Sequence, residues 1–364
     1  MRMRPRHMRL LPVMALAAVS ACASAIVANS KETPLQHLTR AQRAEAIQHA
    51  AVWAPTDVPS MNLRMGPQGK GSYAPFATVP CDYVDVKPSG SSAKFMCDVA
   101  PGDQVKVKYG KDNVEVFAEV AATRLLWALG FGADRWYPVV VVCHGCSDDP
   151  FRDHKNKKDS VTFDIAAIER KMPGKTMEAK PDEGWNWDEL NDTDPADPAQ
   201  KTQRDALRLL AVFLQHTDSK PIQQRLICLP SEAGEDASDG QVDCRQPFML
   251  IHDIGLTFGR ANMFNTNQAS GANFDRWAAV RVWKDPAKCV GKLSASFTGT
   301  LSDPVISEAG RKFLSDLLMQ LSDAQLRDMF EVARFDVHSP APIDSWIDLF
   351  KRKRQEIADV TCPS

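Results

Sequence analysis

Two short segments in the second half of the chain carry residue types that could perform group-transfer chemistry. Residues 216–223 read His-Thr-Asp-Ser-Lys-Pro-Ile-Gln, and residues 253–255 read Asp-Ile-Gly. The first half adds two lysines, Lys106 and Lys108, and a glutamate, Glu119. Phosphoryl transfer needs a cation against the phosphates, carboxylate and amide oxygens that hold a metal ion, and an acceptor for the proton of the attacking hydroxyl. These residues could meet all three needs if the fold brought them together.

The apolar pattern of the first half predicts the elements that would position the two lysines and Glu119. Three strand-like runs cover residues 78–86, 94–99 and 104–109. Gly90 lies in the turn between the first two runs. Side chains alternate along a strand, so Lys106 and Lys108 share one face and their spacing does not choose between them. A helix over 115–129 then carries Glu119, and a buried strand over 136–142 follows.

The second half is predicted to be mainly helical around its two acidic segments. Residues 147–203 are charged, rich in proline and weakly periodic, so we expect an insertion there. Helices are expected at residues 204–215, 307–321, 324–333 and 343–358. Strands are expected near residues 226–229 and 248–251, on either side of an acidic excursion. Residues 22–60 are predicted to form a leader or linker with one helix over 39–52.

These motifs together resemble the protein-kinase-like superfamily. The segment 216–223 is similar to the catalytic loop His-x-Asp-x-Lys-Pro-x-Asn, and 253–255 is similar to Asp-Phe-Gly. The resemblance covers about residues 77–350 and is greater to the divergent phosphatidylinositol kinases and secreted kinases. It implies an α+β, two-lobed fold, with a small antiparallel-sheet lobe over 61–146, the insertion over 147–203 and a mainly helical lobe over 204–364.

The resemblance implies ATP, or another nucleotide, and Mg²⁺ as cofactors. Lys108 would bind the α- and β-phosphates, because the Lys-Tyr-Gly exit from its strand resembles the family better than the surroundings of Lys106 do. Glu119 would orient that lysine. The turn with Gly90 matches the place of the nucleotide-covering loop, although it contains a single glycine.

The resemblance also assigns roles to the two acidic segments. Asp218 would orient or deprotonate a hydroxyl acceptor, and Lys220 would stabilise the transferred charge. Asp253 would bind Mg²⁺. Gln223 stands where the family has a metal-binding asparagine, so the same amide oxygen is one methylene further from the backbone. His216 is expected to position backbone, and not to ionise.

Composition limits the class of protein. The chain has 364 residues, of which 44% are hydrophobic and 25% charged, which excludes a mainly disordered or fibrous protein. The 44 basic residues face 46 acidic ones, for a formal net charge of −2. Nucleic-acid binding needs a basic excess to neutralise phosphates, so we do not expect a nucleic-acid partner.

The first 30 residues indicate export. Four arginines precede residue 10, and residues 10–30 carry no charge, which is typical of a signal peptide. Residues 19–22, Val-Ser-Ala-Cys, resemble the lipobox of bacterial lipoproteins. We therefore expect a signal peptide over 1–21, a lipidated Cys22 that anchors the chain in a membrane, and a place on the periplasmic side of the cell envelope. Cleavage near Ala25 and an uncleaved anchor are the alternatives.

Cysteine usage agrees with an oxidising compartment. Setting Cys22 aside leaves eight of the nine cysteines, an even number that favours disulfides. We expect Cys81 to pair with Cys97 across two strands, Cys143 with Cys146 in a tight bridge, and Cys228 with Cys244 around the acidic excursion. A redox or zinc role for the Cys-x-x-Cys segment 143–146 is the weaker interpretation, because no second pair accompanies it.

Three functions follow as hypotheses. The leading one is an exported, kinase-like protein that binds ATP and Mg²⁺ and transfers a phosphoryl or nucleotidyl group to a hydroxyl of a protein, sugar or lipid. The second is an inactive pseudokinase that acts as an envelope binding or scaffold lipoprotein, which would fit Gln223, the single Gly90 and the scarcity of ATP outside the cytoplasm. The third is a disulfide-rich envelope protein in which the motifs are accidental. In that case Lys108, Glu119, Asp218 and Asp253 would lie apart.

Overall fold

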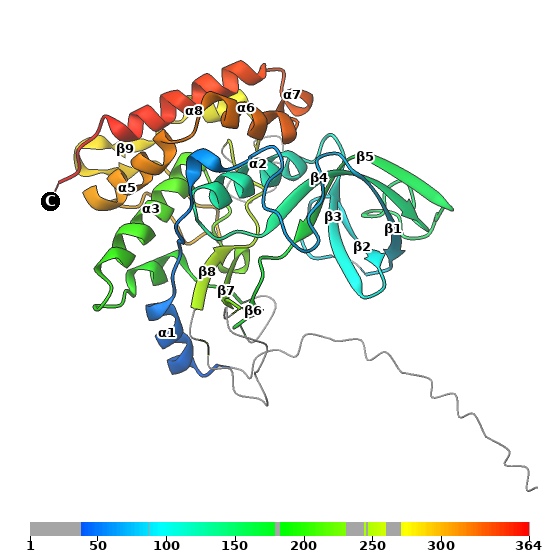
Figure 1. Cartoon of the computed structure of the whole chain (residues 1–364), viewed down its shortest axis with the longest axis horizontal. Helices are drawn as coiled ribbons and strands as arrows, with labels where there is room; N and C mark the ends of the chain where they lie inside the picture. The colour runs from blue at the N-terminus through cyan, green and yellow to red at the C-terminus, as the bar shows by residue number, and fades with distance from the viewer. Residues whose placement is uncertain are drawn as a thin grey trace, which may run out of the picture. The chain divides into compact units, whose positions relative to one another are not determined.

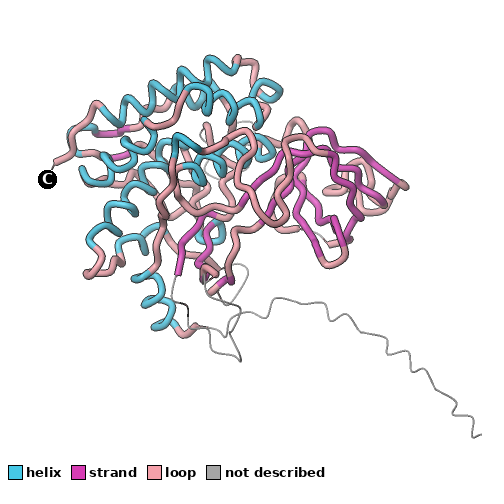
Figure 2. The backbone as a smooth tube through the Cα atoms, viewed as in Figure 1, coloured by secondary structure: helices cyan, strands magenta, loops and turns pink. Residues whose placement is uncertain are grey.

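A computed structural model describes residues 38–86, 88–178, 183–230, 244, 247–259 and 271–363 (Figure 1). The predicted signal peptide, Cys22 and the first part of the leader lie outside these residues. The described chain has a mixed α/β fold. Figure 2 shows that strands dominate between residues 78 and 170 and that helices dominate the second half. Within the described residues, none of the helices combines the length and the apolar character that a membrane span requires.

Five strands of the first half close into a barrel with the order β1-β2-β3-β5-β4. The strands are β1 (Thr78–Val84), β2 (Lys94–Ala100), β3 (Asp103–Tyr109), β4 (Arg135–His144) and β5 (Ser160–Arg170). The pairings are antiparallel except that of β1 with β4, which is parallel. Residues such as Phe95, Val107 and Tyr137 fill the interior. A barrel therefore stands where we expected a small antiparallel sheet.

The barrel includes a strand that we did not predict. β5 lies inside the segment 147–203, which we interpreted as an insertion, and it pairs with both β3 and β4. The helix α3 (Pro198–Leu214) also begins in that segment, six residues before the expected start. The pair Asp197-Pro198 marks the start of this helix in the sequence. The Asp197 side chain accepts hydrogen bonds from the amides of residues 199 and 200, and proline suits the first helical position.

Helix α2 (Glu115–Ala128) connects the barrel with the helical half. Nearly every side chain of α2 is buried, because the helix contacts β3, β4 and β5 as well as α6 (Asp323–Val332). Alanines at 118, 121 and 122 allow this close packing. Arg124 is fully buried, and its guanidinium donates hydrogen bonds to the carbonyls of Leu63 and Trp136. The position of α2 is therefore fixed on several sides.

The second half is mainly helical, as predicted. Its other helices are α4 (Phe274–Ala279), α5 (Glu308–Met319), α7 (Phe335–His338) and α8 (Ile343–Ala358). They share a core of stacked and edge-to-face aromatic rings that includes Trp277, Phe330 and Trp346. Ahead of the barrel, α1 (Arg40–His49) is capped by Thr39, within the range expected for a leader helix.

Two small sheets accompany these helices. β6 (Lys175–Thr176), β7 (Gln224–Cys228) and β8 (Pro247–Ile251) form one, and β9 (Trp283–Asp285) and β10 (Val290–Gly291) form the other. β7 and β8 are the two strands expected beside the acidic excursion, and they pair in an antiparallel register. β8 leads directly into Asp253, so a buried strand supports that carboxylate.

Four disulfides are present. Cys81–Cys97, Cys143–Cys146 and Cys228–Cys244 confirm the three predicted pairs. The fourth, Cys289–Cys362, joins the segment before β10 to the end of α8. All eight cysteines that remain after Cys22 are therefore paired.

Candidate functional site

Lys108 lies at the centre of a buried cluster that three parts of the chain build. Its ammonium nitrogen is 2.6 Å from Glu119 Oε1, 2.7 Å from Glu115 Oε2 and 3.5 Å from Asp253 Oδ2. Lys108 belongs to β3, the two glutamates belong to α2, and Asp253 follows β8. The motifs are therefore not scattered, which removes the basis for treating them as accidental.

Local structure explains why these groups meet. Glu115 and Glu119 are four residues apart on α2, so they lie on one face of the helix. Lys108 points from β3 toward that face, and its ammonium lies 4.8 Å from the centre of the Trp136 ring on β4. The amide of Ile254 donates to Glu119 Oε2 over 3.3 Å, which attaches the loop 253–255 to the same helix.

The cluster favours a charged Lys108 and an ionised Asp253. Burial alone would lower the pKa of Lys108, but Asp253, Glu115 and Glu119 together raise it well above its ordinary value. Burial alone would raise the pKa of Asp253, but Lys108 and the neighbouring cations hold it well below its ordinary value. Burial raises the pKa of Glu119 in spite of Lys108. A carboxylate thus remains available at Asp253 near neutral pH.

Lys106 belongs to a second polar cluster. Its ammonium lies 2.8 Å from Glu169 on β5, and the pair is largely buried. His252 Nδ1 lies 2.6 Å from Asp134 Oδ2 and 3.8 Å from Glu169 Oε1. Lys108 makes the contact with Glu119, so the geometry distinguishes two lysines that the strand spacing alone left equivalent. Sequence reasoning missed Glu115, Asp134 and Glu169, because buried acids are recognisable only once their partners are known.

The segment 216–223 forms a tight loop around Asp218. Asp218 is buried, the amide nitrogen of Gln223 donates to its Oδ2 over 2.7 Å, and Lys220 Nζ lies 3.3 Å from its Oδ1. Burial raises the pKa of Asp218, while Lys220 and Gln223 oppose that rise. A carboxylate with a raised pKa is suited to accept a proton near neutral pH.

The two acidic segments are joined through Gln223. Its backbone carbonyl accepts hydrogen bonds from the amides of His252, at 2.7 Å, and Asp253, at 3.2 Å. His216 is fully buried, and neither ring nitrogen has a hydrogen-bond partner among the described residues. Burial lowers the pKa of His216 to about 4, so the ring is neutral at physiological pH and packs near Trp187.

Lys94 and Ser92 are further site residues that sequence reasoning missed. Lys94 on β2 pairs in register with Lys108 on β3, so the two side chains share a face. Lys94 makes no hydrogen bond or ion pair with any residue that the structure describes, although it is largely buried. Ser92 Oγ is buried and has no hydrogen-bond partner in the part of the chain that the structure describes. The sequence signal was the spacing Ser-x-Lys two residues after Gly90, at the start of the strand that precedes β3.

Gly90 explains how Lys94 fits beneath the turn. Gly90 has a φ of +93°, and a Cβ atom at this position would lie 2.6 Å from Lys94 Nζ. A side chain here would therefore collide with the ammonium and strain the backbone. Burial lowers the pKa of Lys94, and the charge of Lys108 adds to this effect. A largely buried cation that bonds to none of the described carboxylates is a favourable place for an anion.

The oxygen donors of the site fit Mg²⁺. Oxygen atoms of Glu115, Glu119 and Asp253 lie within 4.8 Å of one another. The side-chain amide of Gln223 contacts Asp218, and only its backbone carbonyl bonds to the amide of Asp253. Mg²⁺ prefers hard oxygen ligands such as carboxylates and amide carbonyls. Asp253, whose side chain is 23% exposed, is the acid among these that a hydrated ion could reach most readily.

No protein-family model matches this chain. No curated protein matches it either. Among solved structures, a crystal structure of the Helicobacter pylori proinflammatory kinase CtkA is similar over 78% of this chain and 96% of that one, with 10% sequence identity and a TM-score of 0.41.

Proposed function

We propose that this protein is a kinase-like phosphotransferase that binds ATP, or another nucleotide, with Mg²⁺. It would transfer a phosphoryl or nucleotidyl group to a hydroxyl of a protein, sugar or lipid. The observation that carries the proposal is the contact of Lys108 with Glu119 and Asp253, at 2.6 and 3.5 Å. This arrangement joins a strand, a helix and a loop around one cation, next to Asp218 and Gln223.

The proposal includes a two-lobed arrangement. The barrel would be the smaller lobe, and the helices from α3 onward would form the larger one. Because β5 completes the barrel, we place the end of the smaller lobe near residue 170 and not at 146. Residues 171–178 would then begin the connection between the lobes.

Nucleotide binding would use cations from two neighbouring strands. Lys108 would contact the α- and β-phosphates, and Glu119 would hold its ammonium in place. Lys94 and Ser92 would contact a phosphate beneath the turn at Gly90, since both lack a partner in the described chain. Asp253 and Gln223 would hold Mg²⁺. The bound ion would neutralise charge that develops on the phosphates during transfer.

The transfer step would depend on the loop around Asp218. Asp218 accepts the proton of the acceptor hydroxyl as its oxygen bonds to phosphorus. The bond from phosphorus to the departing phosphate oxygen breaks, and its electron pair stays on the leaving nucleotide or pyrophosphate. Lys220, 3.3 Å from Asp218, would stabilise the transferred charge. Attack at the γ-phosphorus gives phosphoryl transfer, and attack at the α-phosphorus gives nucleotidyl transfer.

A catalytically inactive pseudokinase is the second candidate function. It is favoured by one observation: Lys108 is fully buried and already contacts three carboxyl groups, and Lys106 contacts Glu169 in the same way. Such ion pairs can stabilise the fold without a nucleotide. An envelope scaffold protein would need only this structural role of the two lysines.

Export and lipid anchoring at Cys22 remain part of the proposal. The four disulfides support an oxidising compartment, since such bonds persist mainly outside the cytoplasm. A periplasmic location would limit the supply of ATP, so the donor would be another phosphate compound or one provided by a host.

A thermal-shift titration with ATP and Mg²⁺ tests nucleotide binding. We expect the oxidised protein to be stabilised in a concentration-dependent manner. Asp253→Ala should abolish the Mg²⁺-dependent part of the shift, and Lys94→Gln should weaken the shift. The matched control is Asp148→Ala, because Asp148 is exposed on the barrel side of the chain. An absent shift, or an equal shift in Asp253→Ala, would refute nucleotide binding at this site.

Transfer is tested separately with labelled phosphate. Purified, oxidised protein should incorporate label into itself or into an added hydroxyl acceptor, and Asp253→Ala should not. Binding without transfer in the wild type would favour the pseudokinase.

A further inference from the structure

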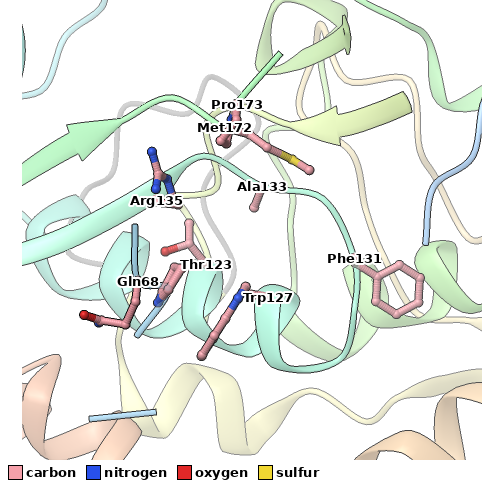
Figure 3. Close-up of a pocket in the computed structure, with 9 residues that line it drawn as sticks. Gln68, Thr123, Trp127, Phe131, Ala133, Arg135, Met172 and Pro173 are labelled. Atoms are coloured by element: carbon pink, nitrogen blue, oxygen red, sulfur yellow. The ribbon is translucent and has the colours of Figure 1, made fainter. Parts of the chain in front are cut away.

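A hollow of about 210 Å³ lies beside the second half of α2, and neither Lys108 nor Asp218 is among the residues that line it (Figure 3). Its walls come from α2, the segment before β4, the segment after β5 and the loop near residue 68. The apolar part of the wall consists of Trp127, Phe131, Ala133, Met172 and Pro173. A space of this size and character can hold a small organic molecule, since an apolar cavity of about 150 Å³ accommodates benzene.

Arg135 provides the charged part of the same wall. One terminal nitrogen of its guanidinium donates to the backbone carbonyl of Lys171 over 3.1 Å. The Tyr137 hydroxyl is a further hydrogen-bonding neighbour of this guanidinium, but no carboxylate of the described residues forms an ion pair with Arg135. The positive charge on this wall therefore has no counter-ion among those residues, and an anion in the hollow would supply one.

We propose that this hollow binds a small carboxylate with a compact apolar body. The carboxylate would accept hydrogen bonds from Arg135, whose planar guanidinium suits two parallel contacts with such a group. The apolar body would lie against Trp127, Phe131 and Met172. A neutral or cationic compound of the same shape would gain the apolar contacts but leave Arg135 without its anion. The inference does not rest on the function proposed above.

The hollow is connected with the Lys108 cluster through two elements. Glu115, Glu119, Thr123 and Trp127 follow one another at intervals of four residues, so all four lie on one face of α2. Asp134 lies between the wall residues Ala133 and Arg135, and it contacts His252 and the amide of Met172. A bound molecule would therefore contact the helix that carries Glu119, and it would lie next to Asp134 of the Lys106 cluster.

Three matched probes test the proposal on the oxidised full chain. 3-Phenylpropanoate, 3-phenylpropanamide and 3-phenylpropylamine have nearly the same apolar body but carry a negative, neutral and positive group. Isothermal titration should show binding of the carboxylate, at least tenfold weaker binding of the amide and none of the amine. Equal affinities for all three, or no binding of the carboxylate, would overturn the proposal.

Variants of Arg135 give the second half of the test. Arg135→Gln should abolish the preference for the carboxylate, and Arg135→Lys should retain part of it because the charge remains. Arg152→Gln is the matched control, since Arg152 is largely exposed and lies outside the hollow. If Arg135→Gln does not fold, the proposal is tested by the relative affinities of the three probes for the wild type and for Arg135→Lys. If both variants, Arg135→Lys and Arg135→Gln, bound the carboxylate as tightly as the wild type does, the binding site would lie elsewhere.

Discussion

The side-chain amide of Gln223 donates a hydrogen bond to Asp218 over 2.7 Å. The backbone carbonyl of the same glutamine accepts the amide hydrogen of Asp253 over 3.2 Å. One residue therefore sets the distance between the acid proposed to accept a proton and the acid proposed to bind Mg²⁺. A glutamine at this position is compatible with an ordered site, in spite of its extra methylene.

Gln223→Ala should weaken metal-dependent nucleotide binding. The variant removes an amide oxygen proposed to hold Mg²⁺ and the donor that fixes Asp218, so the Mg²⁺ concentration at half-maximal binding should rise on the order of tenfold or more. The measurement is a Mg²⁺ titration at fixed ATP. Gln355→Ala serves as the control, because Gln355 is an exposed glutamine of α8. Identical Mg²⁺ titrations for Gln223→Ala and the wild type would show that the glutamine holds no metal.

Lys108→Met should impair both stability and nucleotide binding. It leaves Glu115, Glu119 and Asp253 without their shared cation, and breaking a buried pair on one side costs about 3–5 kcal/mol of unfolding free energy. Denaturant unfolding and ATP titration measure the two effects. Lys106→Met is the comparison, since its ammonium contacts Glu169 and not Glu119. If only Lys106→Met lost nucleotide binding, our choice between the lysines would be reversed.

Asp218→Ala should separate binding from transfer. The carboxylate would act on the acceptor hydroxyl and not on the phosphates, so we expect ATP affinity close to that of the wild type. Transfer should fall by a factor on the order of 10² to 10⁴. Full turnover in this variant would exclude the role given to Asp218. Asp148→Ala should leave both measurements unchanged.

Much of the site could be predicted because its residues follow local rules. Alternation along a strand limited the choice to Lys106 or Lys108, and the helix signal placed Glu119. The choice between the lysines depends on which one faces α2, a long-range contact that neither spacing nor composition encodes. Glu169 was missed because β5 lies in the segment 147–203, which we interpreted as a charged insertion, although β5 itself contains a strand-like apolar run.

The closed barrel was also beyond prediction. It requires the parallel pairing of β1 with β4, and these strands are far apart in the sequence. A short turn between two strands in the sequence indicates that they pair in an antiparallel manner. Parallel strands are not joined by such a turn, so the sequence gives no local sign of their pairing. Lys94 could have been noticed, because it follows Gly90 and Ser92 at strand spacing. Its lack of a partner is visible only in the folded chain.

His216 should make stability depend on pH. Its folded-state pKa is lowered to about 4 by burial, whereas an unfolded histidine titrates near 6.5. Above pH 6.5 neither state is protonated and the stability is complete. As the pH falls from about 6.5 to 4 the unfolded state takes up a proton first, so about 3 kcal/mol of unfolding free energy is lost. His216→Phe removes this group, and the free energy of unfolding of that variant should vary less over the same range. Parallel pH profiles for the two proteins would show that His216 does not titrate on unfolding.

The four disulfides should differ in their contribution to stability. Chain entropy predicts that closing a longer loop stabilises more. Cys289–Cys362 closes a loop with a separation of 73 residues, and its removal should cost about 4 kcal/mol. Cys81–Cys97 and Cys228–Cys244 both have a separation of 16, for about 3 kcal/mol each. Cys143–Cys146 has a separation of 3 and should contribute less than about 2 kcal/mol.

Serine pairs in place of each bridge allow this ranking to be measured by denaturant unfolding. Replacing both cysteines avoids a free thiol that could exchange with the remaining bridges. The double variant of Cys289 and Cys362 should have the lowest midpoint. A larger loss for the pair Cys143 and Cys146 would mean that this bridge supports the end of β4 directly, and that loop length does not govern its effect.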